Sequence, residues 1–335
     1  MALLSVEHLT KHYSLGRSLG GVLRRQPPGW IKPVEDVSFS IAEGEILGIV
    51  GESGCGKSTT CNLLAKLADP TSGHIRFDGE DVTHLSGAAL ARYRAQVQLI
   101  FQDPFDSLNP RMRVFDIVAE APRALGLWDE TEIARRVPEI LALVGLPPKR
   151  YADRFPHQLS GGERQRVGIA SALVPEPRLV IADEPVSMLD VSIRAGVMDL
   201  LRDLSRRLRF SCLYVSHDLS ILTHLCDRVM VMYLGQLVEV ASSHDLVKSP
   251  QHPYTRALVA AVPVPDPAYR RPPVEIKGEL AKPVNPPAGC RFAPRCPLAM
   301  PRCSTTPAMR ETGPGHAVAC HAVGAQDQAR ARVNP

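Results

Sequence analysis

A glycine-rich stretch that follows an apolar run has the residue types of a phosphate-binding loop. After Ile46–Val50 the chain reads Gly51-Glu52-Ser53-Gly54-Cys55-Gly56-Lys57-Ser58-Thr59. The glycines let the backbone approach phosphates closely at positive φ, Lys57 can reach the outer phosphates, and Ser58 can hold Mg²⁺. A buried strand before this loop and a helix over residues 57–67 would aim backbone N–H groups at an anion. We therefore predict a site for a nucleoside triphosphate with Mg²⁺.

Two carboxylates follow a second apolar run and could complete such a site. Asp183 and Glu184 come directly after Leu179-Val180-Ile181-Ala182. A run that is apolar on both faces is typical of a strand inside a parallel sheet, and ligands bind at the carboxyl ends of such strands. Asp183 is placed to bind Mg²⁺ through water, and Glu184 is placed to polarise an attacking water. The alternative is two ordinary surface acids.

A histidine and a helix start are further candidates, each with a structural alternative. His217 follows the apolar run Ser211–Ser216, where the γ-phosphate should lie, although a single histidine is often structural. Ser160 is a natural N-cap for a helix that continues to Val174, and Gly161 and Gly162 leave the first-turn N–H groups bare for an anion. A Ser-Gly-Gly cap is also a common start of an ordinary helix.

The remaining periodicities predict the elements that position these groups. Residues 3–9, 34–42, 73–79 and 97–101 read as strands, and residues 229–236 read as a hairpin at a sheet edge. Apolar residues at helical spacing over about residues 114–156 indicate an inserted helical subdomain. Tyr13 could stack on an adenine ring, or it could simply pack.

Taken together, these motifs resemble the nucleotide-binding subunits of ATP-binding cassette (ABC) transporters over about residues 3–250. Walker A is residues 51–59, the Q-loop glutamine is Gln102, the signature motif is residues 159–165, Walker B is residues 179–184, the D-loop is residues 187–190, and the switch histidine is His217. The resemblance implies an α/β P-loop ATPase fold with a mostly parallel core sheet, an antiparallel β subdomain, a helical subdomain (about 103–158) and a proline-rich C-terminal extension. Met188 in the D-loop departs from the family, which usually has a small residue there.

The resemblance also implies how the site works. Two subunits pack head to tail, and each ATP lies between the Walker A motif of one and the signature motif of the other. The implied ATP-binding residues are Tyr13, Gly51, Ser53, Gly54, Cys55, Gly56, Lys57, Ser58, Thr59, Gln102, Asp183, Ser160, Gly161, Gly162 and Gln165, with Ser58 and Gln102 also on Mg²⁺. Lys57, Glu184 and His217 are the implied catalytic residues, and the open cap at Ser160 awaits an anion from the partner.

Two further segments are similar to the ATPases of oligopeptide and dipeptide importers. They are residues 101–110, Phe-Gln-Asp-Pro-Phe-Asp-Ser-Leu-Asn-Pro, and residues 252–258, His-Pro-Tyr-Thr-Arg-Ala-Leu. The implied partners are a second ATPase subunit (a paralogue or a second copy), two integral membrane permease subunits and a solute-binding protein. Import of nickel, glutathione or oligosaccharides stays open as an alternative to peptides.

Composition narrows the class of protein. The chain has 335 residues, 44% of them hydrophobic, and a net charge of +4 from 39 basic and 35 acidic residues. This charge is too small to indicate a nucleic-acid binder, which disfavours the alternative of a cassette ATPase acting on nucleic acid or ribosomes. The sequence has no apolar run of 18 residues and no secretory leader pattern. We expect a protein held peripherally at the cytoplasmic face of the cell membrane.

The proline-rich segment from residue 251 to residue 335 contains four cysteines. Cys290, Cys296, Cys303 and Cys320 follow the spacing C-x₅-C-x₆-C-x₁₆-C. Such a segment cannot build much of a hydrophobic core, so it needs a cross-link or a bound metal (a staple) to stabilise it. A cytoplasmic location disfavours disulfides, and structural zinc prefers shorter C-x₂₋₄-C pairs, whereas a [4Fe–4S] cluster takes four thiolates at varied spacing. The importer subfamily has a similar cysteine pattern, and there the resemblance implies an iron–sulfur cluster, with zinc or free thiols as the alternatives. We expect an ATPase domain over residues 1–250 and this extension over residues 251–335.

Overall fold

Two β-sheets organise the chain in the computed structural model, which describes residues 2–16, 29–103, 107–262, 276 and 284–323. Within this part of the chain, the larger sheet has the order β11-β12-β10-β9-β3-β8-β7-β6. Its five strands from β9 to β6 run parallel, and β10, β12 and β11 continue the sheet antiparallel. The strand bounds are β3 Ile46–Val50, β6 Val97–Ile100, β7 Leu179–Asp183, β8 Ser211–Ser216, β9 Arg228–Tyr233, β10 Gln236–Ser242, β11 Arg310–Gly313 and β12 His316–Val318.

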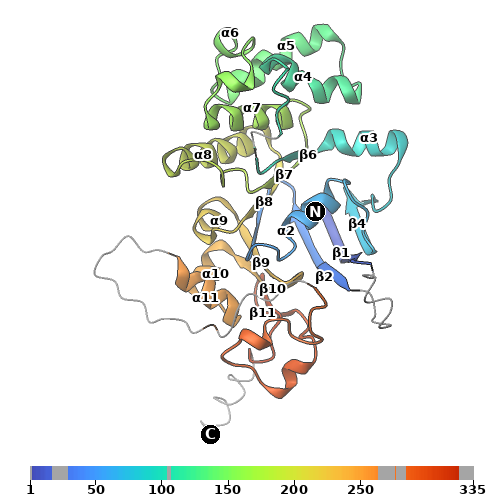
Figure 1. Ribbon diagram of the computed structural model, residues 1–335, viewed down its shortest axis with the longest axis vertical. Coiled ribbons are helices and arrows are strands. Elements are labelled where there is room, and N and C mark those ends of the chain that lie inside the picture. Colours follow the sequence, from blue (N-terminus) through green and yellow to red (C-terminus); the bar gives the residue numbers. More distant parts are fainter. Residues whose placement is uncertain (1, 17–28, 104–106, 263–275, 277–283, 324–335) are drawn as a thin grey trace, which may run out of the picture.

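The smaller sheet is fully antiparallel and lies beside α2 (Figure 1). Its order is β2-β1-β4-β5, with β1 Ala2–Ser14, β2 Trp30–Ala42, β4 Ser72–Phe77 and β5 Glu80–Asp81. Strands β1 and β2 both extend farther than the alternation of residues 3–9 and 34–42 predicted. An α/β fold with a mostly parallel core and a separate antiparallel sheet is therefore confirmed.

Some helices cover the larger sheet, and others lie beyond its edge (Figure 1). Helices α4, α5, α6 and α7 lie at the end of the molecule opposite the C-terminal strands. None of the helices in the described ranges has both the length and the apolar character that a membrane span needs. Their bounds are α2 Lys57–Leu64, α3 Gly87–Gln96, α4 Val114–Leu125, α5 Glu130–Leu143, α6 Pro148–Tyr151, α7 Gly161–Leu173, α8 Val191–Leu208, α9 Leu219–Leu225, α10 Ser243–Lys248 and α11 Pro253–Ala261, with 3₁₀ turns η1 Pro156–Gln158, η2 Ala293–Arg295 and η3 Pro301–Ser304.

Strand β3 shows why the parallel strands are apolar on both faces. Ile46 and Val50 pack into the core that includes α4, α5, α7 and α9, whereas Leu47 and Ile49 pack into the core shared with α2 and the smaller sheet. Successive residues of a strand point to opposite faces, so a strand between two cores has no polar position. This burial fixes the end of β3, and with it the start of the glycine-rich loop.

Two local predictions need correction. The helix expected over residues 57–67 ends at Leu64, where the backbone N–H of Ala65 bonds to Cys61. The hairpin of β9 and β10 exists, but β9 lies inside the sheet between β3 and β10. The other neighbour of β10 is β12, which comes from the C-terminal segment and pairs with Glu239 and Val240. The periodicity of one hairpin could not reveal a strand contributed from 80 residues farther along the chain.

Candidate functional site

The glycine-rich loop joins β3 to the first turn of α2 and takes a shape that specific glycines make possible. Gly56 has φ +113°, and a Cβ there would lie 1.8 Å from the carbonyl oxygen of Pro33. A Cβ on Gly51 would lie 2.2 Å from the carbonyl oxygen of Met232. Both positions therefore exclude every side chain. The close packing of this loop against β2 and β9 holds its backbone in place.

Lys57 is buried at the N-terminus of α2 and turns back over the loop. Its Nζ donates to the carbonyl oxygens of Gly51 at 2.7 Å and Glu52 at 3.2 Å. Ser53, Gly54 and Ser58 are exposed around it, whereas Cys55 is buried. Thr59 is half-buried on the same helix turn. The loop thus offers a cationic group and a helix N-terminus on one surface, which is the arrangement that binds phosphates.

Asp183, at the carboxyl end of β7, fits a divalent cation. Its Oδ1 is buried and has no hydrogen-bond partner among the described residues. Burial raises the pKa of this carboxyl group, the charge of Glu184 raises it further, and a hydrogen bond from the Ser58 hydroxyl opposes the shift. An orphaned buried carboxylate oxygen beside a serine hydroxyl is a donor pair that Mg²⁺ accepts. The residues present therefore fit this metal ion.

Glu184 brings together two side chains that lie far apart in the sequence. Its Oε2 accepts a hydrogen bond from Gln102 Nε2 at 3.3 Å and lies 3.0 Å from His217 Nδ1. Glu184 itself has φ +46°, an uncommon conformation for a residue other than glycine. Its N–H donates to the carbonyl oxygen of Val215 in β8, so the strained residue is fixed to the neighbouring strand. Three predicted site residues thus meet at the carboxyl edge of the parallel sheet.

The motif at the start of α7 lies apart from the loop in this chain (Figure 1). Ser160 is exposed, and a Cβ on Gly162 would approach Ile193 to 2.8 Å. The expected open cap is corrected in one respect, because Ser160 and Glu163 form a reciprocal capping box. The Ser160 hydroxyl donates to Glu163 Oε2 at 2.9 Å, and Tyr151 donates to the other carboxylate oxygen at 2.6 Å.

Two other predicted residues have less direct placements. The Gln165 side chain is only 1% exposed and lies inside the protein, and its Oε1 has no hydrogen-bond partner in the described part of the chain. Tyr13 is exposed near the end of β1, with Lys11 Nζ 5.0 Å from its ring centroid. Trp30 is a second exposed aromatic residue, paired with Ser14 at the start of β2. Its ring lies 6.4 Å from that of His12, between centroids, and sequence reasoning missed it because only the ladder of β1 with β2 brings the two together.

The four C-terminal cysteines lie in a part of the chain where, among the described residues, no group of three or more Cys, His, Asp or Glu side chains is arranged to hold an ion. None of the four forms a disulfide within the described residues. Burial raises the pKa of the Cys290 thiol to about 11, and the nearby thiols of Cys303 and Cys320 contribute in the same direction. The backbone N–H of Cys290 also donates to the carbonyl oxygen of Cys303 at 3.0 Å. Three of the thiols therefore lie near one another.

Comparison with known protein families gives two matches that divide the chain. The ABC transporter family matches residues 34–187, which include the glycine-rich loop and β7. The family "Oligopeptide/dipeptide transporter, C-terminal region" matches residues 238–303, from β10 to the third cysteine of the C-terminal set.

Individual relatives are similar over almost the whole length. A protein of Brucella ovis named as a peptide import ATP-binding protein is 48% identical over 95% of this chain and 97% of its own. Oligopeptide transport ATP-binding protein AppF of Bacillus subtilis is 48% identical over 88% of this chain and 90% of its own. A solved dimer of the ATP-binding cassette MJ0796, bound to ADP and Pi, is 28% identical with a TM-score of 0.62, covering 72% of this chain and 98% of that one. The cassette cbiO1 of Clostridium perfringens is 29% identical with a TM-score of 0.63, covering 74% of this chain and 91% of that one.

Proposed function

This chain belongs to the ATP-binding subunits of ABC transporters in the oligopeptide and dipeptide group, and we propose that it hydrolyses ATP to power peptide import through a binding-protein-dependent transporter. The observation that carries this proposal is the meeting of Gln102, Glu184 and His217 at the sheet edge that also holds the glycine-rich loop. The names of the relatives support the peptide substrate.

We assign the phosphate contacts to the loop and to α2. The cationic Lys57 would stabilise charge on the outer phosphates, and the loop N–H groups would bind the inner ones. Ser58 and Gln102 would hold Mg²⁺, with Asp183 binding it through water. When bound, Mg²⁺ supplies charge stabilisation to the phosphates. The exposed Tyr13 is the proposed adenine contact.

We assign the orientation of the attacking water to Glu184. Its carboxylate already holds Gln102 and His217 on one oxygen, so movement of either partner would shift the carboxylate. His217 is exposed beside it and would contact the γ-phosphate. The rate of hydrolysis should therefore depend on three side chains that three separate segments supply.

We further propose that a second ATPase subunit completes the site. Ser160, Gly161 and Gly162 of the partner would face the phosphates held by this chain, whereas the predicted contact of Gln165 is corrected because its side chain is buried inside its own subunit. The separation of α7 from α2 within one chain is the reason, because a single subunit does not bring both motifs to one nucleotide. The solved dimer of a related cassette supports this arrangement. Met188 is exposed in the D-loop, where it would pack across the interface between the two subunits.

Binding of the permease subunits is best tested with substitutions on the surface beside Gln102. Phe101 is exposed there, whereas the similarly exposed Val247 lies in α10, far from α4 and α5 (Figure 1). We expect the chain to co-purify with integral membrane subunits from the cytoplasmic face of the membrane. Phe101→Asp should lower their recovery severalfold because it places a charge in an apolar contact, and Val247→Asp should not. Recovery of RNA or ribosomes in place of membrane subunits would contradict the proposal.

We also propose that Cys290, Cys296, Cys303 and Cys320 bind a [4Fe–4S] cluster as a structural staple. The neighbouring thiols of Cys290, Cys303 and Cys320 and the chemistry of a four-thiolate set support it. Anaerobically purified protein should contain about four irons per chain and absorb visible light. Cys303→Ala should lose both the iron and the absorption, whereas Cys226→Ala, a buried cysteine of the ATPase core, should keep them. Colourless protein that contains zinc and no iron would contradict the cluster.

A further inference from the structure

The C-terminal segment contacts the phosphate-binding loop directly. Arg295, at the end of η2, donates from Nη1 to both carboxylate oxygens of Glu52, at 2.9 and 3.1 Å. The two side chains are only 10% and 21% exposed. Glu52 is the second residue of the loop, 243 positions earlier in the sequence. A partly buried, charge-assisted pair of this kind fixes both partners far better than an exposed ion pair does.

The backbone of Glu52 is held from the same side of the molecule. Its N–H donates to the Tyr254 hydroxyl of α11 at 3.0 Å. Tyr254 is fully buried, and its ring packs against Tyr233 and Phe292 at centroid distances of 4.8 and 5.4 Å. Arg295 also contacts this aromatic cluster, since its Nη1 lies 3.4 Å from the Tyr233 hydroxyl. The side chain and the N–H of Glu52 therefore both form hydrogen bonds with residues outside the loop.

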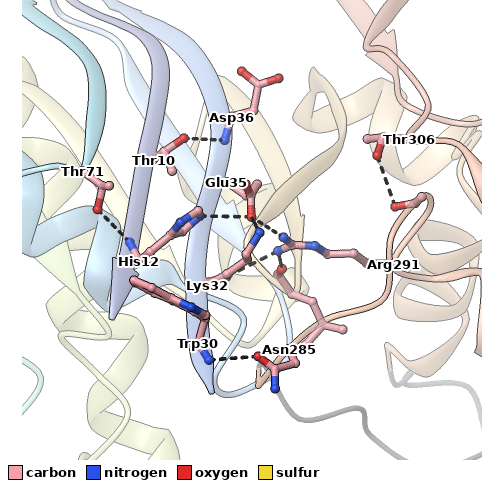
Figure 2. A network of polar contacts seen from close by, with 12 residues as sticks. Thr10, His12, Trp30, Lys32, Glu35, Asp36, Thr71, Asn285, Arg291 and Thr306 are labelled. Atoms are coloured by element: carbon pink, nitrogen blue, oxygen red, sulfur yellow. Dashed lines mark hydrogen bonds and ion pairs between the residues drawn. The ribbon is translucent and has the colours of Figure 1, made fainter. Parts of the chain in front are cut away.

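The C-terminal segment is rigidly attached to the sheets that carry the loop. Arg291 Nη2 lies 2.7 Å from Glu35 Oε2 on β2, and its Nη1 donates to the carbonyl oxygens of Leu234 and Lys32 (Figure 2). On the other side, His316 of β12 lies 2.7 Å from Glu239 of β10, and both are buried. These contacts hold the C-terminal segment, and Arg295 with it, against both sheets.

The carbonyl oxygen of Glu52 accepts from Lys57, the residue proposed to contact the outer phosphates. A displaced Glu52 would therefore displace Lys57. An unpaired Glu52 carboxylate would also place a negative charge close to the phosphates and repel them. Arg295 counteracts both effects.

We propose that Arg295 is a positioning residue for the phosphate-binding loop, through which the C-terminal segment sets the affinity of the ATP site. This inference rests on the proposed function of the loop in ATP binding. It gives the segment a role in the ATPase reaction in addition to any metal that it binds.

The test compares Arg295→Met with Arg302→Met, an exposed arginine of the adjacent turn η3. Arg295→Met should weaken MgADP binding about tenfold in calorimetric titration and raise KM for MgATP by a similar factor, because a charge-assisted hydrogen bond is worth about that much or more. The kcat should change less than about twofold because the residues around Glu184 are untouched. Arg302→Met should match the wild type, and Arg295→Lys should recover most of the affinity.

A double-mutant cycle with Glu52→Gln separates positioning from general packing. If Arg295 acts through Glu52, Arg295→Met should have little further effect in the Glu52→Gln background. An undiminished effect there, or wild-type affinity in Arg295→Met alone, would overturn the inference. If the wild type itself fails to bind MgADP, or if Lys57→Ala binds it equally well, the proposed ATP site fails instead.

Discussion

Replacing Glu184 with Gln is expected to leave ATP binding nearly unchanged and to reduce hydrolysis at least about a hundredfold, since a positioned base contributes roughly 10²–10⁴ in rate. Gln keeps the size of the side chain and an oxygen that can accept from Gln102. It lacks the negative charge that polarises a water. Phosphate release at saturating MgATP, together with equilibrium ATP binding, measures the two effects separately.

The matched control is Glu139→Gln, the same substitution in an exposed ion pair with Arg135 on α5. It should leave both hydrolysis and binding at the wild-type level, because exposed pairs contribute little. Near-normal turnover in Glu184→Gln would contradict the role assigned to this carboxylate.

Replacing Gly56 with Ala is expected to weaken nucleotide binding at least about a hundredfold, which corresponds to ~2.7 kcal/mol. The added Cβ would lie 1.8 Å from the carbonyl oxygen of Pro33, in a residue whose φ is +113°. Backbone strain alone costs about 1–3 kcal/mol, and the contact with a backbone atom adds to it. The loop must move away from β2 and lose its phosphate-binding shape. Titration with MgADP measures the loss.

Gly44→Ala is the matched control, because Gly44 also has a positive φ (+75°) but open space around its Cβ position. It shares the backbone strain and lacks the clash, so its nucleotide affinity should stay close to that of the wild type. Gly51→Ala, with a Cβ 2.2 Å from the Met232 carbonyl oxygen, repeats the test at a second position in the loop. Tight binding in both loop variants would show that this loop does not hold the nucleotide.

The sequence predicted the parts of the site that local pattern encodes. The loop after β3 and the carboxylates at the end of β7 are recognisable because a strand that is buried on both faces is apolar until it reaches its terminal polar residues. Their meeting with Gln102 and His217 followed from a general rule, that the carboxyl ends of parallel strands share one edge. The fold class was predictable for the same reason.

The contacts of the C-terminal segment could not be predicted in this way. Arg295 and Glu52 are separated by 243 positions, and no periodicity relates them. The pairing of β12 with β10 likewise depends on where the chain returns after residue 284. The capping box of Ser160 was visible in principle, since Glu163 stands three residues later, but the open-cap hypothesis gave that glutamate no role.

The mass of the Glu184→Gln protein with MgATP tests the shared site most directly. Alone or mixed with the ATPase subunit that co-purifies with it, the protein should sediment as a dimer with MgATP and as a monomer with MgADP. Adding Ser160→Arg to both subunits should abolish the dimer, because a large cation would fill the place where the motif at the start of α7 meets the phosphates of its partner. A protein that binds MgATP fully and stays monomeric under every one of these conditions would contradict the account.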